Sequence, residues 1–156
     1  MTQPDQHSPD GGLFLDDLHV GQRFTSGTHA IDEAQIKAFA IQFDPQPFHL
    51  DDAAARGTLF GGLAASGWHT AAVTMRLLVD GGAPIAGGII GAGGEVAWPQ
   101  PTRPGDILTV QSEVLEIKPS RSNADRGTVT MRCETLNQSG EIVQKMTATL
   151  IVPTRR

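Results

Sequence analysis

One segment, Phe43 to Asp51, contains a carboxylate and an imidazole, side chains that can exchange protons near neutral pH. Asp44 and His49 are five positions apart, and Pro45 and Pro47 stiffen the backbone between them. A stiff backbone can aim two side chains at one point without a large ordering cost on substrate binding. Histidine has an ordinary pKa of about 6.5, and burial can raise the pKa of an aspartate. The segment therefore predicts an acid/base pair.

A structural interpretation of the same residues is also open, in which Asp44 caps a turn and His49 is an ordinary core or surface histidine. A second feature bears on this choice, a run of small residues that leads into an apolar helix predicted for residues 66 to 79. At the positive end of that helix the amides of Gly67 and Trp68 would be free to stabilise negative charge on a substrate oxygen. Ser66 could instead be the N-cap of an ordinary helix.

Two helices are predicted around these residues. Asp32 with Gln35 is typical of a helix start, and the apolar spacing continues to Asp44, where Pro45 disfavours further helix. The inward residues of this first helix are predicted to be Ile36, Phe39, Ala40 and Phe43. The second helix is apolar on most sides, which predicts a position in the middle of the domain.

The organisation of the chain changes near Gly94, from helical and glycine-rich to strongly alternating. A strand is predicted for Val20 to Ala30 with Phe24 inward, and another through Ile89 and Ile90. Alternating strands follow at Ile107 to Ile117, Thr128 to Leu136 and Glu141 to Val152, the last two joined by a hairpin turn at Asn137 to Gly140. One buried helix and a long antiparallel sheet predict an α+β fold in which the sheet wraps around the helix.

Length and composition predict one domain, residues 13–156, after a flexible polar tail of residues 1–12. A net charge of −5 without a basic cluster argues against nucleic-acid and anionic-membrane partners. No signal peptide or apolar run that could span a bilayer is visible, and the single cysteine, Cys133, fits a reducing compartment as a buried structural thiol. These features predict a cytoplasmic protein.

Other candidate residues receive structural interpretations. The glycine-rich segment 81–94 fits no phosphate-binding motif, and His19, His29 and His69 lack zinc-ligand spacing. We interpret His69 as a packed histidine bonded to the backbone. Trp98 is interpreted as a core or dimer anchor, and Arg103 and Arg121 as surface residues, although either arginine could meet the phosphates of a ligand.

Taken together, the motifs resemble the MaoC-like hydratase/dehydratase family over roughly residues 14 to 152. The family motif Asp-x-Asn-Pro-aliphatic-His, followed by an Ala-His-Gly helix start, corresponds here to Asp44, Gln46, Pro47, Phe48 and His49 and to Ala65, Ser66 and Gly67. Residues 95–106 look like the family's segment ending in Arg-Pro-Gly-Asp, and residues 137–141 look like its final hairpin. The chain departs from the pattern at Phe43, Gln46 and Ser66, where Gly, Asn and His are usual.

The resemblance implies a single hotdog domain, a homodimer and the reversible hydration of a trans-2-enoyl thioester, on coenzyme A or acyl carrier protein, in fatty acid metabolism. In that reaction Asp44 and His49 hold and activate water, and the backbone amide of Gly67 polarises the thioester carbonyl. No cofactor or metal is required. Two other functions stay open because one fold hosts many activities: a hotdog acyl-CoA thioesterase and a non-catalytic acyl-thioester binding protein.

Overall fold

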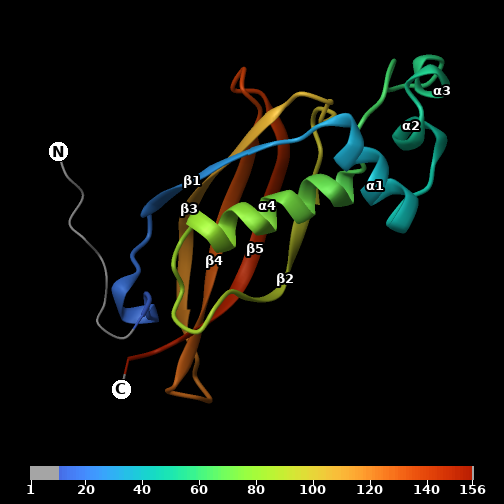
Figure 1. Cartoon of the computed structure of the whole chain (residues 1–156). Helices are drawn as coiled ribbons and strands as arrows, with labels where there is room; N and C mark the ends of the chain where they lie inside the picture. Colours follow the sequence, from blue (N-terminus) through green and yellow to red (C-terminus); the bar gives the residue numbers. More distant parts are fainter. Residues whose placement is uncertain (1–10, 156) are drawn as a thin grey trace.

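A computed structural model describes residues 11–155 of the chain (Figure 1). Of the predicted tail, residues 1–10 lie outside the described residues. The described part holds a five-stranded antiparallel sheet in the order β1-β3-β4-β5-β2. Its strands are β1 (Arg23–Ala30), β2 (Ile90–Ala97), β3 (Ile107–Pro119), β4 (Arg126–Leu136) and β5 (Ile142–Pro153). A helix, α4 (Gly67–Gly81), lies across the curved sheet, which confirms the predicted architecture.

Strands β3, β4 and β5 form the predicted meander. Along β3 the inward residues Leu108, Val110 and Val114 are fully buried, because alternate side chains of a strand point to opposite faces. The turn between β4 and β5 is closed by the amide of Gly140, which donates to the carbonyl of Asn137 at 3.0 Å. Gly140 has a φ of 76°, a conformation that a glycine adopts without strain.

The glycine-rich segment that precedes β3 forms a loop and then the edge strand β2, as predicted. A Cβ atom at Gly94 would lie 2.4 Å from the carbonyl oxygen of Thr147 on β5. The absence of a side chain at Gly94 therefore lets the two strands pair. The register of this pair shifts between Gly91 and Gly93.

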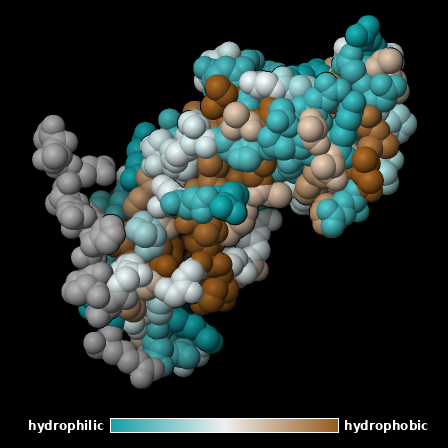
Figure 2. Space-filling model, in the orientation of Figure 1, coloured by the Kyte–Doolittle hydropathy of each residue, from teal (hydrophilic) through white to brown (hydrophobic). Residues whose placement is uncertain are grey.

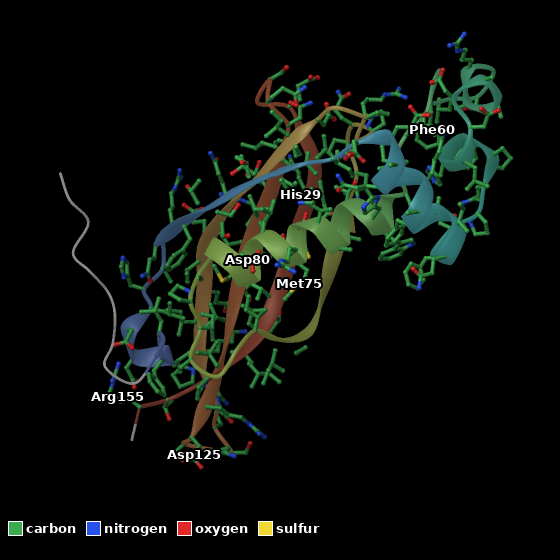
Figure 3. All side chains as sticks on the ribbon, in the orientation of Figure 1. His29, Phe60, Met75, Asp80, Asp125 and Arg155 are labelled. Carbon is green, nitrogen blue, oxygen red and sulfur yellow. The ribbon has the colours of Figure 1, made fainter. Side chains whose placement is uncertain are left out.

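Helix α4 is buried on one side only, which corrects the prediction that it lies in the middle of the domain and not on its surface. Val73, Leu77 and Leu78 pack into the core. The opposite side of the helix carries an exposed stripe of Trp68, Ala72, Met75 and Val79. Figure 3 shows Met75 on α4, and Figure 2 shows apolar surface gathered on this face of the molecule. No helix among the described residues is long and apolar enough to cross a membrane.

Buried polar side chains fasten the first half of α4 to the sheet. Thr70 shares a hydrogen bond of 2.9 Å with Thr102, and Thr74 shares one of 2.6 Å with Thr135 on β4. Gln144 on β5, which is fully buried, donates to Thr74 at 3.3 Å. Buried hydroxyl and amide groups are costly without partners, so these bonds restrict how α4 can be placed.

The remaining helices gather at one end of the molecule (Figure 1). They are α1 (Glu33–Phe43), α2 (Pro47–Leu50) and α3 (Asp52–Arg56). A separate 3-10 turn, η1 (Leu15–Asp17), precedes β1. The Asp32 side chain caps α1 by accepting from the Gln35 amide at 2.9 Å, as predicted. Phe43, however, is 65% exposed, so the prediction that it faces inward is wrong. The two short helices were not predicted.

Candidate active site

Asp44 ends α1, and several hydrogen bonds determine where its carboxylate lies. Its amide donates to the carbonyl of Ala40 at 2.8 Å, which completes the last turn of the helix before Pro45. The Gln46 side chain donates to Oδ1 at 2.5 Å, and the hydroxyl of Ser66 also hydrogen-bonds the carboxylate. The side chain is 17% exposed, so the carboxylate is largely withdrawn from solvent but still accessible.

His49 lies on α2, a helix of one turn that begins at Pro47. Proline suits the first position of a helix because its missing N–H has no partner there in any case. The side chain of His49 is 5% exposed, and its Nδ1 lies 2.7 Å from the carbonyl oxygen of Ala64. A carbonyl only accepts hydrogen bonds, so Nδ1 carries a hydrogen, and whenever the ring is neutral Nε2 is the nitrogen without one.

The structure brings the two predicted residues together. Nε2 of His49 lies 3.3 Å from Oδ2 of Asp44. Burial, the largest single influence, raises the pKa of Asp44, but the hydrogen bonds from Ser66 and Gln46 and the nearby His49 together outweigh it and lower the pKa. The net pKa of this carboxyl is therefore lowered and not raised, although burial by itself raises it, and the group is an ionised carboxylate at neutral pH.

The start of α4 lies beside this pair, because Ser66 both caps α4 and contacts Asp44. Ser66 is 1% exposed, hydrogen-bonds Asp44, and accepts from the amide of Trp68 at 3.3 Å as the N-cap of α4. The expectation that the Trp68 amide is free is therefore wrong. Among the described residues, the amide of Gly67 has no hydrogen-bond acceptor, as predicted.

Trp98 explains why residue 67 is a glycine. A Cβ atom at Gly67 would lie 2.7 Å from the indole of Trp98. The indole N–H donates to Gln144 at 2.9 Å, and the ring meets Trp68 edge to face at 5.2 Å between centroids. Trp98 therefore covers the first turn of α4 and is held there from the sheet.

The other residues that the sequence singled out are not part of this pair. His69 is buried and stacks on Phe39 at 4.6 Å, and burial lowers its pKa. Its Nδ1 has no hydrogen-bond partner among the described residues, so the predicted bond to the backbone is not seen for this nitrogen. Cys133 is buried, which raises the pKa of its thiol and fits the predicted structural role.

An apolar cavity of about 170 Å³ lies between the second half of α4 and the sheet. Met75 and Leu78 of α4 line one side, and Met131 of β4 and Leu150 of β5 line the other. Its lining is almost entirely hydrocarbon, which suits an aliphatic group.

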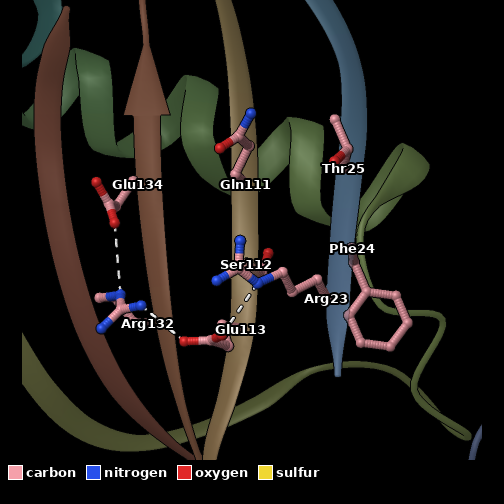
Figure 4. Close-up of a pocket in the computed structure, with 8 residues that line it drawn as sticks. All are labelled: Arg23, Phe24, Thr25, Gln111, Ser112, Glu113, Arg132 and Glu134. Atoms are coloured by element: carbon pink, nitrogen blue, oxygen red, sulfur yellow. Dashed lines mark hydrogen bonds and ion pairs between the residues drawn. The ribbon is translucent and has the colours of Figure 1, made fainter. Parts of the chain in front are cut away.

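A different groove crosses β1, β3 and β4, with α4 behind the strands (Figure 4). Its charged side chains pair with each other: Arg23 with Glu113 at 3.0 Å, and Arg132 with Glu113 at 2.7 Å and with Glu134 at 3.4 Å. Because the two arginines already face carboxylates, this groove offers little to an anionic substrate.

Two parts of the site were not predicted from the sequence. The carbonyl of Ala64 gives no sequence signal, because every residue carries a backbone carbonyl. The bond between Ser66 and Asp44 joins residues 22 positions apart, and sequence reasoning recognised Ser66 only as a helix cap and as a departure from the family motif.

Comparison with known proteins gives consistent matches. A family model described as MaoC like domain matches residues 18–137. The protein YdeM of Bacillus subtilis is 34% identical over 127 residues, which cover 80% of this chain and 87% of YdeM.

Solved structures agree with the family match. The MaoC-like dehydratase from Rhodospirillum rubrum is 63% identical, has a TM-score of 0.91, and covers 93% of this chain and 99% of its own. The unliganded R-hydratase PhaJ1 from Pseudomonas aeruginosa is 30% identical with a TM-score of 0.73, over 92% of this chain and 88% of its own. These likenesses confirm the predicted hotdog fold, and the chain belongs to the MaoC-like domain family.

Proposed function

We propose that the protein adds water reversibly to the double bond of a trans-2-enoyl thioester to give a 3-hydroxyacyl thioester. The observation that carries this proposal is the pair of partly buried Asp44 and buried His49, linked through Ser66 to the start of α4. An acid/base pair beside a free helix amide meets the needs of a reaction that moves one proton and builds negative charge on an oxygen. The likeness to an R-hydratase supports the same reaction.

The protonation states support different tasks for the two side chains. A water molecule can donate one hydrogen to Oδ2 of Asp44 and the other to the lone pair on Nε2 of His49, which are 3.3 Å apart. As the water oxygen attacks the β-carbon, His49 takes the proton, because the lowered pKa of Asp44 makes that carboxylate a weak proton acceptor. The imidazolium, stabilised by the adjacent carboxylate, then returns a proton to the α-carbon.

The amide of Gly67 would serve the carbonyl end of the substrate. Attack at the β-carbon moves negative charge onto the thioester oxygen, and a free amide at a helix N-terminus stabilises that charge. Gly67 is adjacent to Ser66, which contacts Asp44, so the amide and the carboxylate can act on one small substrate. The same amide makes the β-carbon more electrophilic before the attack.

The apolar cavity is a site for the hydrocarbon tail of the acyl group. Met75, which lines the cavity, is eight residues after Gly67 on α4, or roughly 12 Å at the rise of an α-helix. A four-carbon enoyl group held at Gly67 would not span this distance within one protomer, whereas a chain of ten or so carbons would. A series of chain lengths therefore reports whether the cavity takes part in binding.

We also propose a homodimer as the minimum assembly. Within residues 11–155 no strand pairs with the outer side of the edge strand β2, and the stripe of Trp68, Ala72, Met75 and Val79 leaves apolar surface exposed on α4. A two-fold axis would pair two β2 edges and bury both stripes. Light scattering should therefore give twice the mass of one chain, and a stable monomer would contradict this assembly.

The reaction is tested by the loss of enoyl-thioester absorbance with crotonyl-CoA and longer trans-2-enoyl-CoAs. Asp44→Asn and His49→Ala should each lower kcat/KM by about 10² or more, the size of lost acid/base catalysis. Asp80→Asn and His19→Ala are the matched controls, since Asp80 lies in the last turn of α4, paired with Arg76, and the side chain of His19 is exposed. Both controls should keep wild-type rates.

Other results would point to other functions. Release of free coenzyme A without loss of the double bond would identify a thioesterase. Saturable binding of enoyl-CoA without any product, in folded dimeric protein, would identify a binding protein. Equal activity of wild type and both site variants would remove Asp44 and His49 from the reaction.

A further inference from the structure

For Arg103 the sequence predicted either a surface position or a contact with a phosphate. In the structure its guanidinium instead binds backbone carbonyls of the protein. It donates to the carbonyl of Gly62 at 2.9 Å, to that of Leu63 at 3.3 Å, and to that of Phe60. Three carbonyls of one short segment, residues 60–63, thus converge on a single cation. The guanidinium is therefore committed to the backbone rather than presented to a substrate phosphate.

Arg103 is itself held in place from the sheet. Its amide donates to Oδ2 of Asp106 at 2.8 Å, and Oδ1 of Asp106 accepts from Gln138 at 3.1 Å. Asp106 is 6% exposed, so these bonds are shielded from water. The arginine is thus anchored between the segment 60–63 and the hairpin that joins β4 to β5.

The segment that Arg103 holds leads directly to the group that orients His49. Ala64 follows Leu63, and its carbonyl accepts from Nδ1 of His49 at 2.7 Å. The amide of Ala64 donates to the carbonyl of Phe48 at 3.2 Å, and the next amide, that of Ala65, donates to the carbonyl of Thr102 at 2.9 Å. A shift of the segment would therefore move the acceptor of the histidine hydrogen.

A lysine at position 103 cannot make the same set of hydrogen bonds. The guanidinium is planar and carries five donors in a rigid fork, whereas an ammonium group is a compact, strongly hydrated charge on a flexible chain. A lysine at position 103 keeps the charge and loses the simultaneous contact with three carbonyls. Arginine-to-lysine exchange thus separates the geometry of residue 103 from its charge.

We propose that Arg103 is a positioning residue that, through the segment 60–63, holds the Ala64 carbonyl where it keeps the His49 hydrogen on Nδ1. In the neutral ring Nε2 is then the nitrogen without a hydrogen, and it lies on the side of Asp44. The kinetic consequence rests on the proposed function, whereas the tautomer of His49 can be observed whatever the reaction is.

The test measures the ¹⁵N imidazole resonances of His49 in full-length Arg103→Lys and Arg103→Ala at a pH where the ring is neutral, together with kcat and KM for an enoyl-CoA. Wild type should show the Nδ1–H tautomer, and both variants should show a mixture of tautomers. We expect kcat to fall about tenfold in Arg103→Lys and about 10² in Arg103→Ala, with KM changed less than threefold. Arg76→Lys, at an exposed pair with Asp80, is the matched control and should change neither readout.

A variant of a second contact with the segment 60–63 keeps the test decisive if Arg103→Ala does not fold. Oδ1 of Asp52 accepts from the amide of Leu63 at 2.9 Å, so Asp52→Ala loosens the same segment from its other side. It should shift the tautomer in the same direction as Arg103→Lys. Folded Arg103→Lys with wild-type tautomer would overturn the proposal even if kcat falls. An inactive wild type with the expected tautomer change would contradict the proposed function and leave the role of Arg103 supported.

Discussion

The outer groove of the sheet and the candidate active site both contain paired ionisable side chains, and they differ in how those side chains are satisfied. On the outer face of the sheet, Glu113 binds both Arg23 and Arg132, whose side chains are 77% and 42% exposed. At the candidate active site, Asp44 and His49 are 17% and 5% exposed. The site is stabilised by neutral partners, an amide, a hydroxyl and a carbonyl, instead of opposite charges.

The difference lies in the hydrogen-bonding capacity that each cluster of polar groups has left. In the outer groove each arginine already faces a carboxylate, and water screens what remains of the charge. At the site, hydrogen bonds orient one atom of each side chain and leave Oδ2 and Nε2 directed at the same point. The site is therefore distinguished by Oδ2 of Asp44 and Nε2 of His49, which are largely withdrawn from solvent and can still form hydrogen bonds, and not by charge itself.

The largest effect is expected for Gly67→Ala, which places a methyl group against the indole of Trp98 at 2.7 Å. Because Gln144 holds the indole, the first turn of α4 must shift and carry the Gly67 amide with it. We expect kcat/KM for an enoyl-CoA to fall by about 10² to 10³, the usual effect of losing an oxyanion donor. Tryptophan fluorescence should change in parallel.

Gly57→Ala is the matched control, since a Cβ atom there would meet nothing within 4 Å, and activity should stay at the wild-type level. Replacing Trp98 by Ala in the Gly67→Ala protein should restore part of the activity if the clash is the cause. Full activity of Gly67→Ala with unchanged fluorescence would remove the Gly67 amide from the reaction.

An intermediate effect is expected for Ser66→Ala. The variant loses a hydrogen bond that lowers the pKa of Asp44, so this pKa should rise. Since the folded pKa of Asp44 lies below its unfolded value of about 3.9, its carboxylate stabilises the fold above that pH, and the stabilisation is lost as pH falls through the folded pKa. In Ser66→Ala the acid limit of activity should move to higher pH, with kcat down roughly tenfold at neutral pH, the size of one bond to a charged group.

Ser66→Ala also removes the cap of α4, which costs about 1 kcal/mol of stability. Asp32→Ala removes the cap of α1 and separates the two effects, because it should lower the melting temperature without moving the acid limit of activity. An acid limit that is the same in Ser66→Ala and wild type would show that Ser66 acts as a cap alone.

The smallest effect is expected for Glu113→Gln in the outer groove. It breaks the pairs with Arg23 and Arg132, but exposed pairs contribute at most about 1 kcal/mol. Enoyl-CoA turnover should stay within about twofold of wild type, and the small loss in melting temperature should shrink at high salt. A tenfold loss of turnover would show that the groove, and not only the pair of Asp44 and His49, serves the reaction.

Local patterns predicted most of the fold. The alternation in β3, β4 and β5 and the proline after Asp44 act over a few residues, so the sequence displays them directly. The one-turn helices α2 and α3 were missed because they are too short for a periodic signal. The exposed stripe on α4 was missed because an apolar side chain looks the same whether it packs in its own core or against another surface.

The sequence by itself predicted which groups could react: Asp44, His49 and the Gly67 amide lie within two residues of prolines or small residues whose local effects are strong. Only the tertiary structure decided their chemical states. The pKa of Asp44 is lowered because Ser66, 22 residues away, reaches its carboxylate, and the hydrogen of His49 lies on Nδ1 because the carbonyl of Ala64 accepts it. Hydrogen bonds between distant segments depend on how those segments pack, and no local pattern records that packing.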